Sequence, residues 1–566
     1  MSKSRLMRFA TLAAILALVA ASCSSGKTNT PATPKKGGSI VVAAEQWLTC
    51  MNPLTSCNGA LWQNILNWQV MPRLSQWDEH TNLVHSDLTT EVPSLTNGGI
   101  TKSPFTVTYH LNPKAVWADG TPITSKDVRF TWLAKKNTKG VYATAGYDLI
   151  TDVDASVPQT VVIKFKSIYT DWPDLFGGND AGILEAAAFP NNKNADLTKV
   201  LQTGPLPFSG GPWIQQTFTT TESVFVRNTK FWGTQTLLDK MTLVPRTDQN
   251  TEIQALLSGE VQVVGHPQPT NVSLLRQLAP NPNAKAITTT GNFYEALFLN
   301  NEDPVLKDNK VREALFYAVD RQQVIDGLIK LNKPDAQILN CAYISLPGSG
   351  PWCGKSYFDQ FSYQPSKALS ILKDDGWNCD KVPASPCTKG SQSLNMTYRF
   401  CNGNARRQTT YELLKEKAPA AGFKFTQVAK GSDCSSPLFD QTLPKGLFQI
   451  GDYGQGPVTD PTPTGNAACE QVPTKANSYA GGNYERWCNR KATDLMHQSD
   501  AELDNTKRLA LLQQVYELEV ADHVLLPLYV LPSVIMYRAD KIGGPIGTWN
   551  DSPYTGMFNS NEWYLK

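Results

Sequence analysis

The chain has 566 residues, of which 52 are Lys or Arg and 50 are Asp or Glu, so its formal net charge is +2. A balanced charge offers no strong basic field, which argues against a nucleic-acid-binding protein. The length exceeds what one hydrophobic core supports and predicts two or three lobes. The 14 Trp and 19 Tyr supply many amphipathic side chains, a composition that weakly favours ligand capture.

The N-terminus has the pattern of an export signal. Three basic residues precede a short apolar stretch, residues 12–19, which is too short to span a bilayer. The following residues Leu18–Cys23 resemble a bacterial lipobox, in which cleavage exposes a cysteine for lipidation, although Ala20 stands where Leu is usual. We therefore expect a signal peptide over residues 1–22 and a lipid anchor on Cys23. Ordinary secretion is the alternative.

The residues after Cys23 have the composition of a spacer. Residues 24–38 are rich in Ser, Thr, Pro, Lys and Gly and contain no aromatic residue. We expect a flexible tether over residues 23–37 that holds the folded part at the outer face of the bacterial cell membrane.

The next elements alternate between strand and helix patterns. Residues 105–111 alternate and are rich in β-formers, and Asp119-Gly120 is a turn dipeptide. Thr124 stands three residues before Asp127, close to a capping box that opens a helix. Further strands are predicted at residues 160–165 and 224–227.

The C-terminal part repeats this mixture. Apolar residues recur at helical spacing in residues 308–325 and again in residues 509–518, and Leu525–Tyr529 has the pattern of a strand. These apolar stripes are the expected core. Leu447–Ile450 is predicted as a strand that leads into a Gly/Pro-rich loop, residues 454–461. The mixture of strands and helices indicates an α/β fold.

Ten cysteines follow Cys23, and an even number in an exported chain indicates disulfide bonds. No two of them form a C-x-x-C motif and the six histidines are scattered, so we expect no structural zinc site. Eight of the ten lie in residues 341–488, which predicts one lobe with stapled loops. The favoured connectivity is sequential, although the sequence leaves other pairings open: Cys50 with Cys57, Cys341 with Cys353, Cys379 with Cys387, Cys401 with Cys434, and Cys469 with Cys488.

The sequence lacks the motifs of common enzymes. It contains no nucleophile elbow, Walker loop, dinucleotide fingerprint or H-E-x-x-H motif, each of which would supply a nucleophile, a phosphate cradle or a metal. We therefore expect neither an enzyme nor a cofactor. A Ser/His/Asp set that assembles only in space is the remaining alternative.

Four stretches carry a family resemblance, in chain order: Phe105–Leu111 with Trp117–Val128, Gly210–Trp213 with Val226–Gly233, Leu299–Arg321, and Gly481–Cys488. The first holds a strand, a D-G-T-P turn and a helix start, and the third reads VREALFYAVDR from Val311. Together they resemble the peptide-binding family of extracytoplasmic solute-binding proteins, family 5, the receptors of ABC importers for dipeptides, oligopeptides and nickel. The second stretch departs from the family's G-T-G-P-Y element. The fourth resembles a segment that closes a local disulfide in dipeptide receptors, which supports pairing Cys469 with Cys488.

The resemblance implies a periplasmic-binding-protein-like fold, in which two α/β lobes are joined by a hinge and an extra lobe is inserted in the first. The expected boundaries are residues 38–70, 201–291 and 528–566 for lobe I, 71–200 for the extra lobe, and 292–527 for the disulfide-rich lobe II.

The resemblance also implies a ligand site between the lobes. In peptide-binding relatives the ligand lies extended and an aspartate holds its α-ammonium group. Asp452 is the candidate for this role, Asp460 is its rival because the gap before Asp460-Pro461 is enlarged, and a loop aspartate bonded to its own backbone is the alternative for Asp452. The other residues expected on the cleft walls, where core packing is the alternative for each aromatic side chain, are Glu45, Trp47, Trp213, Asn292, Phe293, Tyr294 and Tyr453.

The expected function is capture of a short peptide and its delivery to the permease of an ABC importer by a monomeric, lipid-anchored receptor. Other solutes of the family are alternatives: a nickel chelate, a sugar, an opine or a signalling peptide. An exported hydrolase is a less favoured alternative. The expected partners are the peptide ligand, the permease subunits and the membrane, with no nucleic acid.

Overall fold

The computed structural model describes residues 34–566 except 46, 49, 56–60, 79–82, 140, 142–145, 178–181, 247, 266–276, 332, 342–355, 434–437, 456–462, 478, 480 and 548–556. The predicted signal peptide and Cys23 lie outside these residues. The longer helices are α2 (Leu61–Val70), α3 (Ser125–Asn137), α4 (Gln249–Ser258), α6 (Asn309–Ala318), α8 (Pro365–Asp374), α9 (Ala405–Lys417), α11 (Arg490–Asp500) and α12 (Asn505–Ala521). The shorter ones are η2 (Tyr147–Leu149), η3 (Trp172–Asp174), η4 (Ala186–Ala188), η5 (Lys193–Ala195), α7 (Arg321–Val324), η6 (Ile325–Ile329), η8 (Ala418–Ala421), η9 (Leu438–Thr442), α10 (Thr464–Ala467), η10 (Cys469–Gln471) and η11 (Ser560–Glu562).

Most of the longer strands belong to one mixed sheet with the order β16-β15-β17-β12-β18-β11-β1-β10-β9-β8. Its strands, in chain order, are β1 (Ser39–Ala44), β8 (Trp213–Phe218), β9 (Ser223–Arg227), β10 (Lys240–Pro245), β11 (Val263–Val264), β12 (Ala284–Leu299), β15 (Asn395–Arg399), β16 (Lys424–Gln427), β17 (Ile450–Gln455) and β18 (Leu525–Arg538). A second sheet has the order β4-β5-β7-β6 and is built from β4 (Ile100–Lys102), β5 (Phe105–His110), β6 (Ile150–Val157) and β7 (Thr160–Phe165). Short pairs are formed by β2 (Ser75–Trp77) with β3 (Leu83–His85), β13 (Thr388–Lys389) with β14 (Gln392–Ser393), and β19 (Ile542–Gly543) with β20 (Tyr564–Leu565).

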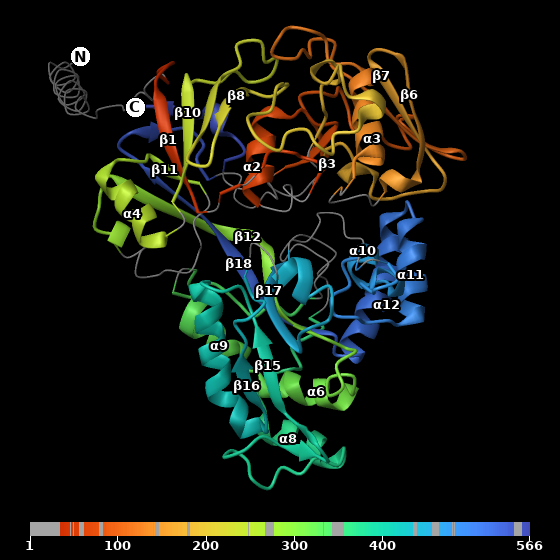
Figure 1. Cartoon of the computed structure of the whole chain (residues 1–566), viewed down its shortest axis with the longest axis vertical. Helices are drawn as coiled ribbons and strands as arrows, with labels where there is room; N and C mark the ends of the chain where they lie inside the picture. Colours follow the sequence, from red (N-terminus) through yellow and green to blue (C-terminus); the bar gives the residue numbers. More distant parts are fainter. Residues whose placement is uncertain are drawn as a thin grey trace, which may run out of the picture. The chain divides into compact units, whose positions relative to one another are not determined.

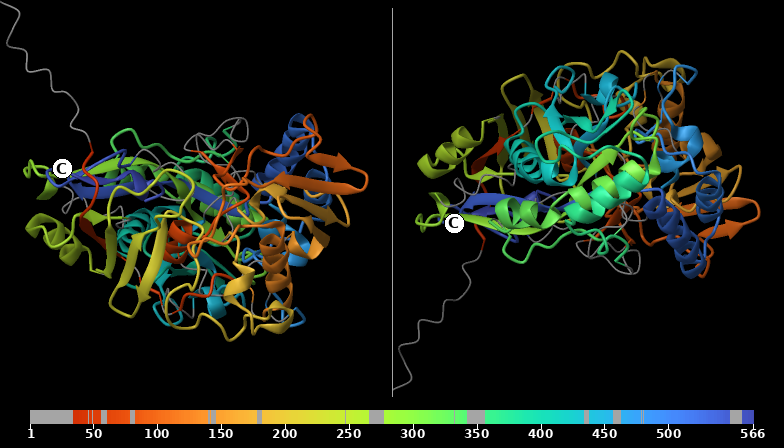
Figure 2. Two further views of the ribbon diagram at one scale, coloured as in Figure 1. Left: turned by 90° about the horizontal axis from the view of Figure 1, so that it is seen from above. Right: turned by 90° about the horizontal axis from the view of Figure 1, so that it is seen from below.

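The strands β12 and β18 connect the two halves of the fold. They pair antiparallel from Ala284 opposite Arg538 to Phe298 opposite Leu525. Buried residues 294–299 and 524–529 belong to one hydrophobic core, whereas Ala284, Val534 and Met536 belong to another. We call residues 36–288 with 534–566 the first half and residues 294–529 the second half. Figures 1 and 2 show the two strands running side by side from one half into the other.

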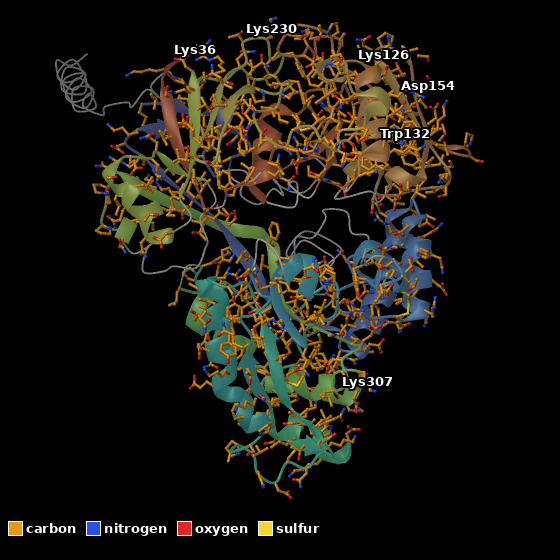
Figure 3. All side chains as sticks on the ribbon, viewed as in Figure 1. Lys36, Lys126, Trp132, Asp154, Lys230 and Lys307 are labelled. Atoms are coloured by element: carbon orange, nitrogen blue, oxygen red, sulfur yellow. A yellow bond between two sulfur atoms is a disulfide. The ribbon has the colours of Figure 1, made fainter. Side chains whose placement is uncertain are left out.

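In the first half, α3 packs against β6 and β7, α2 contacts β8, and α4 contacts β11. Helix α3 begins at Ser125, and Thr124 and Asp127 form the expected capping box. The buried residues of α3 include Trp132, and the helix packs against β6 and β7 (Figure 3). Residues of the predicted lobe I and of the predicted extra lobe share one hydrophobic core, so the lobe boundaries within the first half stay predictions.

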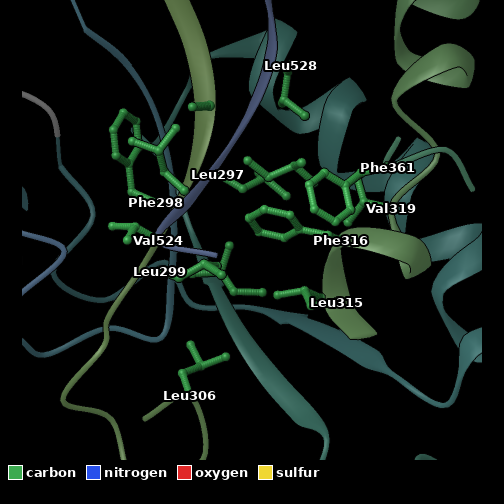
Figure 4. Packing of buried hydrophobic residues seen from close by; sticks show 14 of the residues in the cluster. Leu297, Phe298, Leu299, Leu306, Leu315, Phe316, Val319, Phe361, Val524 and Leu528 are labelled. Atoms are coloured by element: carbon green, nitrogen blue, oxygen red, sulfur yellow. The ribbon is translucent and has the colours of Figure 1, made fainter. Parts of the chain in front are cut away.

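The core of the second half forms where α6 packs beside the crossing strands. Leu297 and Leu299 of β12 lie on the side of Leu315 and Phe316 of α6, whereas the ring of Phe298 lies on the other side of the strand (Figure 4). Asp308 caps α6, and Asp320 accepts a hydrogen bond from the Gln323 amide to open α7. Burying one such Leu or Phe side chain contributes roughly 1.5–3 kcal/mol.

Two strand predictions need correction. The predicted strand at Leu525–Tyr529 continues to Arg538, because β12 pairs with it along this length. The predicted strand at Leu447–Ile450 is wrong: β17 begins only at Ile450, and Leu447 is 60% exposed. Asp452 and Tyr453 therefore lie inside a strand and not in the loop that follows it.

Two of the expected cysteine pairs have their sulfur atoms at bonding distance. The distance is 2.05 Å for Cys379 and Cys387 and 2.16 Å for Cys469 and Cys488. Cys50, Cys341 and Cys401 are also disulfide-bonded. Their expected partners Cys57, Cys353 and Cys434 lie outside the described residues, so these three pairings stay predictions.

Candidate functional site

Trp213 belongs to the core of the first half. It opens β8, is fully buried, and its indole nitrogen donates to Ser560 Oγ at 3.1 Å. The preceding Gly211 lies against the end of α2, where a Cβ atom would collide with the carbonyl of Gln69. This packing explains the Gly-Gly-Pro-Trp stretch, and of the two expected places for Trp213 the structure favours the core.

Glu45 follows directly after β1, at the carboxyl end of this strand. β1 runs parallel to β10 and β11, and open sheets with parallel strands bind ligands at this edge. The side chain is 7% exposed and accepts a hydrogen bond from the indole nitrogen of Trp62 in α2. Burial raises the pKa of Glu45 to about 8.

A second buried carboxyl group, on Glu252 of α4, lies near Glu45. Burial first, and then the charges of Glu45 and Asp248, raise the pKa of Glu252 to about 9. Glu45 Oε1 and Glu252 Oε1 are both buried and accept no hydrogen bond from a described residue. The sequence reasoning missed Glu252, because one acidic residue in a short helix gives no signal that it points inward.

Trp47 lies on the surface of the first half near β8. Its indole nitrogen donates to the carbonyl of Thr219 at 2.9 Å, and its ring stacks on Phe218 with 6.1 Å between ring centroids. The indole therefore has protein partners, and nothing in these contacts brings it to Glu45.

Strand β12 contains three predicted site residues where it passes from the first half into the second. The side chain of Asn292 lies outside the described residues, and Phe293 pairs with Leu531 in the ladder. Tyr294 is fully buried, and its hydroxyl group donates to Gln455 Oε1 of β17 at 2.9 Å. The β12·β18 register shifts between Thr290 and Phe293, so the ladder is interrupted where the strands pass between the halves.

Asp452 and Tyr453 point to opposite faces of β17, as neighbours in a strand do. The ring of Tyr453 stacks on Phe298 with 3.9 Å between centroids, and its hydroxyl group lies 3.4 Å from Glu485 Oε1. The Asp452 carboxyl group is 1% exposed and accepts a hydrogen bond from the Tyr398 hydroxyl group at 2.8 Å. Neither side chain faces solvent.

Asp452 belongs to a buried network around Glu295 of β12. The Glu295 carboxylate receives hydrogen bonds from Arg406 Nη2 at 2.6 Å and from Arg407 Nη2 at 2.9 Å. Burial opposes the charge of Glu295, but these two guanidinium groups lower its pKa to about 2. Burial and the negative charge of Glu295 raise the pKa of Asp452 to about 8. Asp452 is therefore a neutral acid beside an ionised one at neutral pH.

The sequence reasoning missed this network because its members are far apart in the chain. Arg406 and Arg407 lie in the first turn of α9, whose N-cap residue Asn404 accepts a hydrogen bond from the Arg407 amide. The sheet brings Glu295 to this helix across more than a hundred residues. A pair of adjacent arginines on a helix usually indicates a solvated face, so no local signal revealed the buried carboxylate.

Within the described residues, no three His, Cys, Asp or Glu side chains are grouped so that they could hold a metal ion. In the same residues no helix is long and apolar enough to cross a membrane. The rival aspartate Asp460 lies outside the described part of the chain. Among the described residues, the predicted site residue Glu45 and its neighbour Glu252 each have a buried carboxyl oxygen without a hydrogen-bond donor.

Comparison with known sequences gives a family match and a named relative. Residues 90–469 match the family described as bacterial extracellular solute-binding proteins, family 5 Middle. The oligopeptide-binding protein OppA of Mycobacterium tuberculosis is 25% identical over 447 residues, which cover 77% of this chain and 71% of the relative.

Solved structures share the fold over almost the whole chain. The periplasmic EDTA-binding protein EppA has a TM-score of 0.79 at 19% identity and covers 96% of this chain and 99% of its own. The oligopeptide-binding protein AppA from Bacillus subtilis, solved with a nonapeptide, has a TM-score of 0.76 at 20% identity and covers 94% of this chain and 100% of its own. The α/β, two-lobe fold is thereby established. Because the matched segment exceeds half of the chain, this protein belongs to the family 5 extracellular solute-binding proteins, the substrate-binding receptors of ABC transporters.

Proposed function

We propose that this chain is a lipid-anchored receptor that captures short peptides between its two halves and delivers them to the permease of an ABC importer. No bond is broken in this process. The family of receptors also includes binders of other solutes, so a nickel chelate, a sugar, an opine or a signalling peptide is the second candidate for the ligand.

The observation that carries the proposal is the pair of buried carboxyl groups on Glu45 and Glu252. Each has an oxygen atom without a hydrogen-bond donor among the described residues, and both pKa values are raised by burial. A buried polar group without a partner costs about 1–3 kcal/mol, which a ligand's ammonium group would recover by donating hydrogen bonds. A peptide with a free N-terminus supplies such a group.

The break in the β12·β18 ladder supports capture by closure. The register shift between Thr290 and Phe293 lies where β12 and β18 cross between the halves, so a bend there would change the angle between them. A ligand that touches both halves favours the closed arrangement by its additional contacts.

The burial of Asp452 weakens its candidacy as the ammonium partner. Its neutral carboxyl group already forms hydrogen bonds with Tyr398 and Glu295, and its strand β17 lies inside the second half. Asp460 stays an alternative prediction. We favour Glu45 for the ammonium group, with Phe293 on the opposite wall.

Two of the relatives are peptide-binding proteins, which favours a peptide over other solutes. OppA of Mycobacterium tuberculosis is an oligopeptide-binding protein, and AppA was solved with a nonapeptide. EppA, in contrast, is an EDTA-binding protein, so the same fold also holds a polycarboxylate. An ammonium group would stabilise the ionised form of Glu45 or Glu252 on binding, whereas the carboxylates of EDTA would not.

The test compares peptide affinity in E45Q and E252Q with affinity in the control E260Q. Glu260 lies in the same half but is 55% exposed and paired with Arg246. Tri- to pentapeptides with a free N-terminus should bind E45Q at least about tenfold more weakly than the parent protein, because an ammonium group would ionise Glu45 on binding and form a charge-assisted hydrogen bond that a glutamine cannot supply. E260Q should bind normally. Equal affinities in all three variants would remove Glu45 and Glu252 from the site.

A further inference from the structure

The two halves meet a second time, away from the crossing strands. Arg508 of α12 donates from Nη2 to Asp171 Oδ1 at 2.9 Å, and the two side chains are only 1% and 6% exposed. Asp171 belongs to the first half, just before η3, whereas α12 belongs to the second half. This contact is therefore an ion pair buried between the halves.

Neighbouring groups reinforce the contact. The Thr170 amide donates to the carbonyl of Asp500 at 3.1 Å, which forms a backbone hydrogen bond between the halves. Leu503, from the turn between α11 and α12, packs against the hydrophobic core of the first half. An ion pair, a hydrogen bond and an apolar contact thus act at one place.

Arg508 neutralises a set of acids that would otherwise face each other. Asp171 and Asp174 from the first half and Asp500 from the second half all act on Tyr169, and Arg508 is the cation among these charges. Without the guanidinium group, carboxylates from both halves would repel one another at short range. The guanidinium group of Arg508 therefore offsets this repulsion where the two halves touch.

We propose that the Asp171–Arg508 ion pair is a latch that forms when the halves close and that sets the closed fraction before any ligand binds. Opening at the crossing strands would separate the pair and return both charges to water. The latch is independent of the ligand's identity, because none of its residues belongs to the proposed ligand site.

The latch is also linked to the segment before it. The Asp500 side chain accepts a hydrogen bond from Thr464 Oγ1 of α10 at 2.8 Å. Thr464 stands four residues after Asp460, beside the predicted ligand loop.

Hydrogen exchange of the unmodified mature protein gives the first test. A latch opens without unfolding, so the Thr170 amide should exchange much faster than the amides of Leu74 and Leu339, whose hydrogen bonds to Phe176 and Leu528 lie within one half each. If Thr170 exchanges only as slowly as these two amides, the contact is a permanent part of the fold and the proposal fails.

Variants give the second test. R508A should accelerate exchange at Thr170 by at least about a hundredfold, since breaking a buried pair leaves an uncompensated charge, and should enlarge the radius of gyration of the ligand-free protein in small-angle X-ray scattering. The double variant D171R/R508D should restore both values. D239A, which removes an ion pair with Arg227 inside the first half, is the matched control and should change neither.

Unchanged exchange at Thr170 in R508A would overturn the latch. If R508A does not fold, the exchange ratio in the unmodified protein decides alone. Absence of peptide binding would contradict the proposed function. It would not change the expected exchange rate at Thr170 or the expected radius of gyration, because both are measured without a ligand.

Discussion

Asp452 resembles the family's ligand-binding aspartate by its position in the sequence, yet its side chain is buried inside the second half. Its carboxyl group is neutral, receives a hydrogen bond from Tyr398 and lies beside the Glu295 carboxylate. D452N keeps the shape and a donor for Glu295, so its unfolding free energy should stay within about 1 kcal/mol of the parent protein. D452A leaves Tyr398 and Glu295 without this partner and should lose about 1–3 kcal/mol.

Urea unfolding at pH 7 measures both variants. The same preparations should bind a peptide ligand with unchanged affinity. A tenfold loss of affinity in D452N at unchanged stability would instead assign Asp452 to the ligand site.

The carboxyl groups of Glu45 and Glu252 predict a pH dependence of stability. Their pKa values in the folded protein, about 8 and about 9, lie above the ordinary value of 4.5, so the folded chain keeps protons that the unfolded chain has released. Their stabilising contribution is complete below pH 4.5 and is lost as the pH rises through 8 to 9. The loss amounts to at most about 1.4 kcal/mol per pH unit for each proton.

Thermal unfolding at pH 5, 6.5 and 8 checks this slope. The double variant E45Q/E252Q should flatten the decrease between pH 5 and 8, because a glutamine does not titrate, whereas E260Q should keep the parent slope. A slope that persists in the double variant would assign it to other groups, such as Asp452 and Glu485, whose pKa values are also raised, to about 8 and about 7.

Among the elements, helix α9 is joined to strand β12 by a buried network of ion pairs. Glu295 is fully buried and holds both Arg406 and Arg407. E295A leaves two buried guanidinium groups without a counterion and should cost about 3–5 kcal/mol. Urea unfolding of E295A is the measurement, and E302Q is the matched control.

Glu302 pairs with Arg486 but is 61% exposed, so its loss should cost less than about 1 kcal/mol. If E295A and E302Q lower the free energy of unfolding by the same small amount, the buried network stabilises the second half no more than an exposed ion pair does.

Local signals predicted some elements well and failed at others for identifiable reasons. The capping box of Thr124 and Asp127 predicted the start of α3, because the two residues lie within four positions of each other. β17 was misplaced because its residues Gly451-Asp-Tyr-Gly454 disfavour a strand, yet β12 and β15 on either side supply ladder partners that override propensity.

The candidate site was harder to predict than the fold. Glu45 was found because it follows a strand, a local pattern. Glu252 and the Glu295 network depend on contacts between distant segments, which one sequence does not reveal. Trp213 was ambiguous because an aromatic residue after a glycine pair has the same pattern in a core and in a cleft.

At the scale of the whole molecule, the N-terminal cysteine predicts where the receptor works. Replacing Cys23 by Ser should release the protein from the membrane fraction, since the lipid chains are its expected anchor. Cell fractionation followed by mass spectrometry of the mature N-terminus measures this directly. An unmodified Cys23, or membrane association that persists in C23S, would contradict the anchor and favour simple secretion.

Peptide capture without chemistry is the central claim, and native mass spectrometry of the mature protein with a library of di- to pentapeptides tests it most directly. We predict complexes with one intact peptide per chain, no cleavage products, and a raised melting temperature, because a ligand at a hundredfold excess over Kd stabilises the folded state by about 2.7 kcal/mol. Retention of a sugar or a metal chelate with no bound peptide would contradict the peptide assignment. Release of cleaved peptides would contradict the receptor role itself.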